Sequence, residues 1–509
     1  MEPIPIPELT GNETVNVALD TIRIGKQALV FLNTKQSAEK CAEEIAKKIS
    51  TGSKGLGELS LSVLKSLPNP TKQCRRLSGC ISKGIAFHHA GLTHSQRIMI
   101  EDNFRNGLVK VICATPTLAM GVDLPAYRAI IRDLKRFGPH GLQWIPVLEY
   151  LQIAGRAGRP KFDTEGQAII IASSETEKKR VYERYVLGEP EDIYSKLAVE
   201  PVLRTYLLSL ISTGFASTKT GLVGFFSKTF WAHQFRDMEQ MEGTISRMLM
   251  LLEEWGFIKT DNDEFVSASD VGREVSISAT IPGRRVAELC IDPLTAHQFV
   301  LGIKKAAAKK TNAFSYLHLI SSTLEMRPLL RVKAKEFDEF QEKIAENEGL
   351  LLQDEPSVYD AEYDDFVSSV KTAQFFQDWA DEDGEEKLLE KFNIRPGEIR
   401  VKLDSADWLL YACQELCRIL NAKGAASDVM KARLRVKYGA KEELFPLLKL
   451  KNIGRVRARK LFNRGIKDVK DIKQAGLYVL AGIVGEKIAA DIKKQVGEKA
   501  EKTNTLKGY

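Results

Sequence analysis

Short apolar runs alternate with amphipathic segments over the first third of the chain. Five of these runs have the length and composition of buried parallel strands: residues 27–32, 85–88, 109–114, 129–133 and 168–172. Ser37 provides an N-cap for an amphipathic helix that runs to Ile49, and residues 95–104 form another helix. Residues 52–77 begin as a loop, because they are rich in glycine, serine and lysine and are then broken by proline. This alternation predicts an α/β domain with a mostly parallel sheet.

The pattern changes beyond residue 172, where amphipathic helices replace the alternation. Helices over residues 201–212 and 238–254 are followed by two short strands at 256–259 and 265–267, which is the outline of a winged helix. From residue 292 onward the pattern is helical throughout. The predicted fold class is therefore multidomain, with an α/β lobe (1–195), a winged helix (196–290), a helical domain (291–422) and a basic C-terminal domain (423–509).

The composition fits a folded protein that binds nucleic acid. The 509 residues are 44% hydrophobic and 28% charged, which excludes a wholly disordered chain. The sequence has neither an apolar run of about 18 residues nor a secretion signal, so we expect a cytoplasmic protein without membrane spans. Residues 421–509 carry 22 basic and 9 acidic residues, whereas residues 336–391 carry 4 basic and 19 acidic residues. This asymmetry favours nucleic-acid binding over a merely solvated charged surface.

The C-terminal region contains an internal repeat. Ile453-Gly454-x-x-x-Ala458 recurs as Val484-Gly485-x-x-x-Ala489, and each copy suits a tight turn that opens a helix. A helix N-terminus presents free N–H groups to an anion, as a helix-hairpin-helix does to a DNA phosphate. We predict phosphate contacts at the first copy, rather than an ordinary helical hairpin, by Gly454, Arg455, Arg457, Arg459 and Lys460.

Residues 152–160 (QIAGRAGRP) carry the strongest chemical signal in the chain. Arg156 and Arg159 are three residues apart, so they are expected on one face of a helix. Arginine forks onto phosphate oxygens and suits the charge that develops on a γ-phosphate. Gln152 and Gly155 belong to the same string, and its glycines permit close approach to another surface.

Residues 114–125 (ATPTLAMGVDLP) follow a predicted strand, at the edge where open α/β sheets bind ligands. The hydroxyls of Thr115 and Thr117 can reach a nucleic-acid backbone. Gly121 and Asp123 are expected near the nucleotide, where Asp123 could instead orient an arginine. A third string, residues 87–92 (FHHAGL), has adjacent histidines whose side chains diverge on a strand, so no metal site is predicted.

These three strings, in this order after residues 29–34 (LVFLNT), resemble motifs IV, IVa, V and VI of the second motor lobe of superfamily-two helicases. The chain is most similar to archaeal repair helicases akin to the helicase half of DNA polymerase theta. Residues 291–295 (IDPLT) and 407–410 (DWLL) extend the resemblance beyond the lobe. The resemblance implies a RecA-like lobe, a winged helix, a helical ratchet domain and a helix-hairpin-helix-type domain.

The resemblance implies an ATP-driven 3′-to-5′ translocase that unwinds single-stranded and forked DNA in repair and recombination. Arg156 and Arg159 match the arginine fingers that act on ATP and Mg²⁺ held by the other motor lobe. Gln152 matches the glutamine coupled to the nucleotide, and Thr115 and Thr117 match DNA contacts.

Two further DNA-binding features are implied by the resemblance. Residues 132–145, which begin at Arg132, occupy the place of a strand-separating hairpin with Phe137 and Trp144 as wedges; a plain surface hairpin is the alternative. Trp408 occupies the place of a ratchet-helix aromatic that stacks on bases, with Arg400 or Lys402 as its basic partner, unless it is a core tryptophan.

The 509 residues lack a G-x-x-x-x-G-K-[ST] phosphate loop and a credible acidic Mg²⁺ motif, since Gly25-Lys26 and Asp263-Glu264 fit neither. We therefore expect no ATP hydrolysis by this chain alone, which would act as a monomer with a separately encoded first motor lobe. Asp123 also replaces the asparagine usual in this branch. Two alternatives remain open: a non-catalytic DNA-binding clamp derived from a helicase, and a fragment of an RNA helicase.

Overall fold

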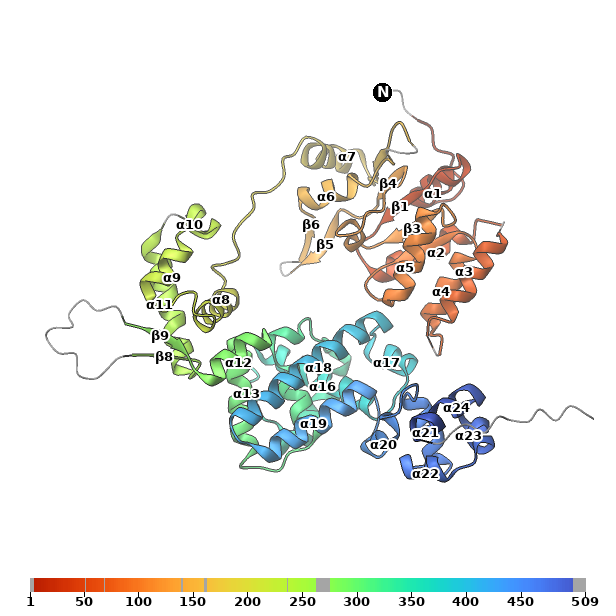
Figure 1. The fold of residues 1–509 in the computed structure, drawn as a ribbon. Coiled ribbons are helices and arrows are strands. Elements are labelled where there is room, and N and C mark those ends of the chain that lie inside the picture. Colours follow the sequence, from red (N-terminus) through yellow and green to blue (C-terminus); the bar gives the residue numbers. More distant parts are fainter. Residues whose placement is uncertain are drawn as a thin grey trace, which may run out of the picture. The chain divides into compact units, whose positions relative to one another are not determined.

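The computed structural model describes residues 4–50, 52–67, 69–138, 141–159, 163–235, 237–261 and 275–497 (Figure 1). The chain divides into two compact units. The first, called here the α/β unit, comprises Met1–Ile193 together with Asn393–Arg400, and the second, the helical unit, comprises Tyr194–Phe392 and Val401–Tyr509.

A parallel sheet forms the centre of the α/β unit, as the sequence predicted. Among the described residues it has five strands in the order β2-β3-β1-β4-β7, and every neighbouring pair is parallel. The strands are β1 (Ala28–Phe31), β2 (Ile85–His88), β3 (Val111–Ala114), β4 (Arg128–Ile131) and β7 (Gln167–Ile170). The first four strands are buried along their whole length, which explains their continuous apolar sequences.

Helices pack against this sheet and connect its strands (Figure 1). They are α1 (Glu13–Arg23), α2 (Lys35–Ala46), α3 (Lys54–Leu64), α4 (Lys72–Ile81), α5 (His94–Arg105), α6 (Val147–Ala154) and α7 (Glu175–Val181). The N-cap of α2 is Thr34 rather than the predicted Ser37, because the Thr34 hydroxyl accepts the Ser37 N–H at 3.0 Å. The predicted loop after residue 52 is largely helical, since Ser53 caps α3 and Thr71 caps α4.

A two-stranded hairpin follows β4. Strands β5 (Lys135–Gly138) and β6 (Gly141–Trp144) are antiparallel, and Phe137 pairs with Leu142 across them. Residues 139 and 140, between the two strands, lie outside the described residues.

The helical unit begins with α8 (Glu200–Ser212), α9 (Lys219–Phe226), α10 (Phe230–Phe235), α11 (Met238–Glu254) and α12 (Ile281–Leu289). Strand β8 (Ile258–Thr260) pairs in antiparallel fashion with β9 (Ile277–Ala279). The strand predicted at residues 265–267 lies outside the described residues.

The rest of this unit is helical: α13 (Pro293–Ala306), α14 (Ala313–Ser321), α15 (Phe337–Asn347), α16 (Tyr363–Ala380), α17 (Glu385–Phe392), α18 (Pro396–Ile419) and α19 (Lys423–Tyr438). The first turn of α18 belongs to the α/β unit and the remainder to the helical unit. Among the described helices, none combines the length and the apolar character that a membrane crossing requires.

Residues 440–497, called here the C-terminal module, have a hydrophobic core of their own. The helices are α20 (Phe445–Leu448), α21 (Arg455–Asn463), α22 (Val469–Gln474), α23 (Leu477–Val484) and α24 (Glu486–Gln495). Gly454 and Gly485 directly precede α21 and α24, so both copies of the repeat do open a helix.

Candidate functional site

The chain leaves helix α6 before it reaches Arg156 and Arg159. Because α6 ends at Ala154, the prediction that the two arginines share one helix face is wrong. The backbone pairs with the segment before β4 instead: Ala126 N–H donates to the Arg156 carbonyl oxygen at 2.9 Å, and Gly158 N–H donates to the Ala126 carbonyl oxygen at 2.6 Å. These bonds join the second string, residues 152–159, to Ala126, the residue that directly follows the first string, residues 114–125.

Glycine is required where this segment turns. Gly158 has a φ of +96°, which disfavours any residue with a side chain. A Cβ placed on the neighbouring Gly166 would lie 2.3 Å from the Gly158 nitrogen. The close approach predicted from the glycines of this string is therefore an approach of the backbone to itself.

Arg156 points toward the end of the first string. Its guanidinium donates to the Ala119 carbonyl oxygen, and one terminal nitrogen lies 3.8 Å from the Asp123 carboxylate. The Asp123 side chain is 97% exposed, and Gly121 has a φ of +79°. The Arg156 Nε is buried without a hydrogen-bond partner among the described residues. Asp123 is thus placed to orient Arg156.

Arg159 is held by a buried carboxylate. It donates to Asp163 at 2.7 Å and to the Gln27 side-chain oxygen at 2.6 Å, while Lys26 lies 2.6 Å from Asp163. The hydrogen bond from Arg159 is the main cause that lowers the pKa of Asp163 to about 2, and Lys26 adds to it. Sequence reasoning missed Asp163, although its spacing of four from Arg159 is that of a helical ion pair.

Gln152 and Gly155 complete this region. Both are exposed, Gln152 within α6 and Gly155 immediately after it. Both are thus accessible to a ligand, and guanidinium groups such as those of Arg156 and Arg159 are suited to the phosphates of a nucleotide such as ATP.

The two threonines lie where β3 ends. The Oγ1 atoms of Thr115 and Thr117 are 2.9 Å apart, and Thr117 is exposed while Thr115 is buried. Arg132, which follows β4, forks onto Asp133 at 2.9 and 2.8 Å. Thr117 is thus accessible to a ligand, whereas the Arg132 side chain is already paired.

Of the two wedge candidates in the hairpin, Phe137 is exposed and Trp144 is packed against other residues. Phe137 is 85% exposed at the far end of β5. Trp144 is half-buried at the base, with the Lys135 ammonium 4.2 Å above its ring and Tyr185 against its edge. Arg136 donates to Glu149 of α6 at 2.9 Å, so the hairpin is tied to the helix that precedes the two arginines.

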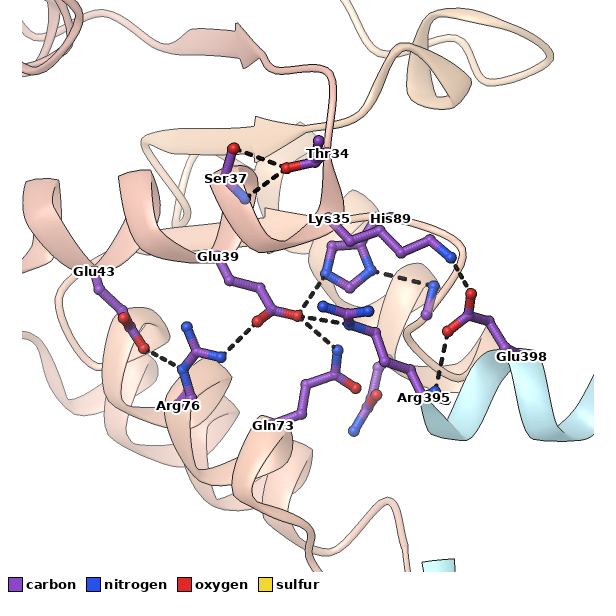
Figure 2. Close-up of polar contacts among 12 residues, drawn as sticks. Thr34, Lys35, Ser37, Glu39, Glu43, Gln73, Arg76, His89, Arg395 and Glu398 are labelled. Atoms are coloured by element: carbon purple, nitrogen blue, oxygen red, sulfur yellow. Dashed lines mark hydrogen bonds and ion pairs between the residues drawn. The ribbon is translucent and has the colours of Figure 1, made fainter. Parts of the chain in front are cut away.

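A buried carboxylate, Glu39, organises the other side of the α/β unit (Figure 2). Its side chain is 3% exposed and accepts hydrogen bonds from Gln73 at 3.0 Å, His89 at 3.1 Å, Arg395 at 3.1 Å and Arg76 at 2.5 Å. Burial would raise the pKa of Glu39, but the hydrogen bonds from His89 and Gln73 and the charge of Arg395 lower it to about 2. The five residues are called here the Glu39 cluster.

The histidine pair has a structural role. His89 is neutral, since burial lowers its pKa, and its tautomer is fixed because Nδ1 accepts the Gly91 N–H while Nε2 donates to Glu39. His88 bonds Glu101 at 2.9 Å. Among the residues described, no three His, Cys, Asp or Glu side chains come together as metal ligands would.

The start of α18 is fitted closely to this cluster. Gly397 N–H donates to the Gly91 carbonyl oxygen at 3.0 Å, and a Cβ on Gly397 would lie 2.3 Å from the Leu92 carbonyl oxygen. Lys35 pairs with Glu398 in the same contact (Figure 2). This contact could not be predicted from the sequence, because Lys35 and Glu398 are 363 residues apart.

Further along α18, Trp408 is half-buried and donates its indole N–H to the Leu289 carbonyl oxygen at 3.0 Å. Lys402 donates to the Pro328 carbonyl oxygen at 2.8 Å, whereas Arg400 is exposed. In the C-terminal module, Arg457 and Lys460 are exposed, but Arg455 and Arg459 are half-buried.

The sequence of this chain is similar to those of known proteins. Residues 68–161 match the family described as the helicase conserved C-terminal domain, and residues 314–439 match domain 4 of archaeal helicases. The ATP-dependent DNA helicase Hel308 of Methanococcus vannielii is 37% identical over 527 residues, which cover 97% of this chain and 69% of that protein. The Hel308 helicases of Methanocella arvoryzae and Pyrococcus abyssi are each 37% identical over 505 residues; 97% of this chain is covered in both cases, with 66% and 68% of those proteins. The chain therefore belongs to the Hel308 family of ATP-dependent DNA helicases.

Proposed function

We propose that this chain is the second motor lobe and the DNA-binding part of an ATP-dependent 3′-to-5′ helicase that acts on forked DNA. The observation that carries the proposal is the contact of Arg156 with the segment after β3: its backbone pairs with Ala126, and its guanidinium donates to the Ala119 carbonyl oxygen and lies beside Asp123. A change in the position of Arg156 on binding nucleotide would pass directly to the segment that carries Thr115 and Thr117.

The nucleotide is ATP with Mg²⁺, held mainly by a further motor lobe that bears a phosphate loop. Bound ATP supplies the phosphoryl group that is transferred to water. Arg156 and Arg159 provide positive charge toward its phosphates, and Gln152, near the end of α6, contacts the nucleotide. Arg159 must first exchange its bonds to Asp163 and Gln27 for phosphate.

DNA contacts extend along the chain from Thr117 through the hairpin. The link between Arg136 and Glu149 connects the hairpin to α6, so strand separation and nucleotide sensing share one helix. In the helical unit, Trp408 stacks on bases, with Arg400 or Lys402 as its basic partner. We assign residues 196–290 to a winged helix, 291–422 to a ratchet domain and 423–509 to a helix-hairpin-helix-type domain.

In a motor assembled from both lobes, Phe137→Ala should lower the rate of unwinding of forked DNA by at least about tenfold, while DNA-stimulated ATP turnover persists. Phe137 is 85% exposed, so thermal stability should hardly change. Trp144→Ala provides the contrast, since loss of a packed ring should cost about 2 kcal/mol of stability. Normal unwinding by Phe137→Ala would exclude the wedge.

The purified chain alone should bind forked DNA tightly and hydrolyse no ATP, with or without DNA. A fluorescence-polarisation titration and a phosphate-release assay measure the two activities. Adding a motor lobe with a phosphate loop in trans should restore turnover and unwinding. Turnover by the chain alone would contradict the proposal. Binding without any restoration would identify the alternative, a clamp that keeps the motor fold.

A further inference from the structure

The four basic residues predicted to contact phosphate lie on two sides of α21. Arg455 and Arg459 are four positions apart and so lie within about 40° of each other around the helix, whereas Arg457 and Lys460 lie on the opposite side. Exposure follows the same division, since Arg457 and Lys460 are exposed and the other two are half-buried.

Arg455 is inserted between two other segments of the helical unit. Its guanidinium lies 4.0 Å from the centroid of the Trp379 ring and donates to the Gly439 carbonyl oxygen at 3.4 Å. The Trp379 ring is itself fixed by an N–H bond to the Val436 carbonyl oxygen at 2.7 Å. Burial lowers the pKa of Arg455, as expected for a cation surrounded by protein rather than by water.

Gly439 makes this insertion possible. Its φ is +59°, and a Cβ there would lie 2.7 Å from Trp379 and 2.8 Å from the Arg455 guanidinium. The end of α19 therefore adopts a backbone geometry that leaves room for an arginine against a tryptophan face.

The guanidinium group of Arg459 forms hydrogen bonds with carboxylates of the protein itself. Its Nε and one terminal nitrogen bond the two oxygens of Glu382 at 2.8 and 2.5 Å, and the same nitrogen bonds Glu443 at 2.9 Å. Glu382 also accepts the Lys441 N–H at 3.2 Å. A phosphate has the same bidentate geometry, so DNA could reach this edge of Arg459 only by displacing Glu382.

The backbone at Glu382 is strained in support of this pairing. Glu382 has a φ of +78°, a left-handed conformation that a glutamate rarely adopts. Such a conformation persists where the surroundings over-determine it, and here the ion pair with Arg459 and the bond to Lys441 do so.

We propose that Arg455 and Arg459 are positioning residues that dock the C-terminal module onto the ends of α16 and α19, and that Arg457 and Lys460 are its phosphate contacts. The inference deepens the proposed DNA-binding function and rests on it. Glu382 and Trp379 are the receiving side of this docking interface.

The test compares two variants that remove opposite partners of one ion pair, Arg459→Gln and Glu382→Gln. Docking predicts the same effect from both: faster hydrogen exchange at the start of α21 and at residues 380–385, and forked-DNA affinity that falls up to about threefold. The slope of log K against log salt should not change in either. Arg457→Gln and Lys460→Gln should each lower that slope by about 1 without changing exchange.

Opposite effects would overturn the inference. If Arg459 binds phosphate, Arg459→Gln lowers the salt slope by about 1, and Glu382→Gln raises DNA affinity because it releases the arginine. Should Glu382→Gln fold poorly, the exchange measurement is repeated with Glu443→Gln, which removes the second carboxylate that bonds Arg459. If the wild-type chain binds no forked DNA, the proposed function fails, yet the exchange measurements still decide whether the two arginines dock the module.

Discussion

Replacing Glu39 by glutamine is expected to lower the free energy of unfolding of the α/β unit by about 3 kcal/mol at pH 7. The Glu39 cluster lowers the pKa of this carboxyl from 4.5 to about 2, and that difference corresponds to roughly 3 kcal/mol of stabilisation of the ionised form. Glutamine keeps the shape, but it turns an amide N–H₂ toward a group that donates to Glu39, and it leaves the half-buried Arg395 without this counter-charge.

The effect should depend on pH with a definite sign. The folded pKa lies below the unfolded value, so the stabilisation is fully present above pH 4.5 and is lost as the pH falls toward 2. The difference in unfolding free energy between the wild type and Glu39→Gln should therefore shrink between pH 5 and pH 3. Hydrogen exchange of the amides in β1 and β3 measures this unit separately from the rest of the chain.

Glu43→Gln is the matched control. Glu43 lies one turn further along α2 and bonds the same Arg76, but its side chain is 30% exposed. We expect it to cost less than about 1 kcal/mol, as partly exposed ion pairs do. Equal losses in the two variants, or a difference that does not change with pH, would show that Glu39 does not stabilise the unit through its charge.

The sheet could be predicted from the sequence because its signal is local. Each strand is a continuous apolar run, and burial on both faces produces that pattern without reference to distant residues. Errors arose where two local signals competed. Thr34 and Ser37 are both good caps, and only the three-dimensional path of the chain places Thr34 at the cap and Ser37 in the first turn.

The Glu39 cluster could not be predicted, because its members come from residues 39, 73, 76, 89 and 395 and no short pattern marks them. The charge asymmetry has a second origin besides nucleic-acid binding. Part of the acidic segment faces basic residues of the same chain, since Glu382 binds Arg459. Net charge alone cannot separate such internal pairing from a surface that attracts DNA.

The prediction with the largest effect on activity concerns Arg156. In a motor assembled with an ATP-binding lobe, Arg156→Ala should lower DNA-stimulated ATP turnover by about 10³-fold, the effect of removing an arginine finger. Affinity for single-stranded DNA should remain within about twofold, because the threonines and the DNA-binding modules are untouched. Stability should also remain, since the bonds to Ala126 are made by the backbone and survive the substitution.

Arg159→Ala should abolish turnover as well, but with a loss of about 1 to 2 kcal/mol in stability, because Asp163 is buried and, among the residues that the structure describes, keeps Lys26 alone as a cation. Asp163→Asn separates the two roles: it weakens the hold on Arg159 while leaving the arginine in place, so turnover should survive even though stability falls. A turnover assay beside thermal unfolding distinguishes these cases. Full turnover in Arg156→Ala would remove Arg156 from the nucleotide site, and full turnover in Arg159→Ala would leave Arg159 the structural role that its bonds to Asp163 and Gln27 describe.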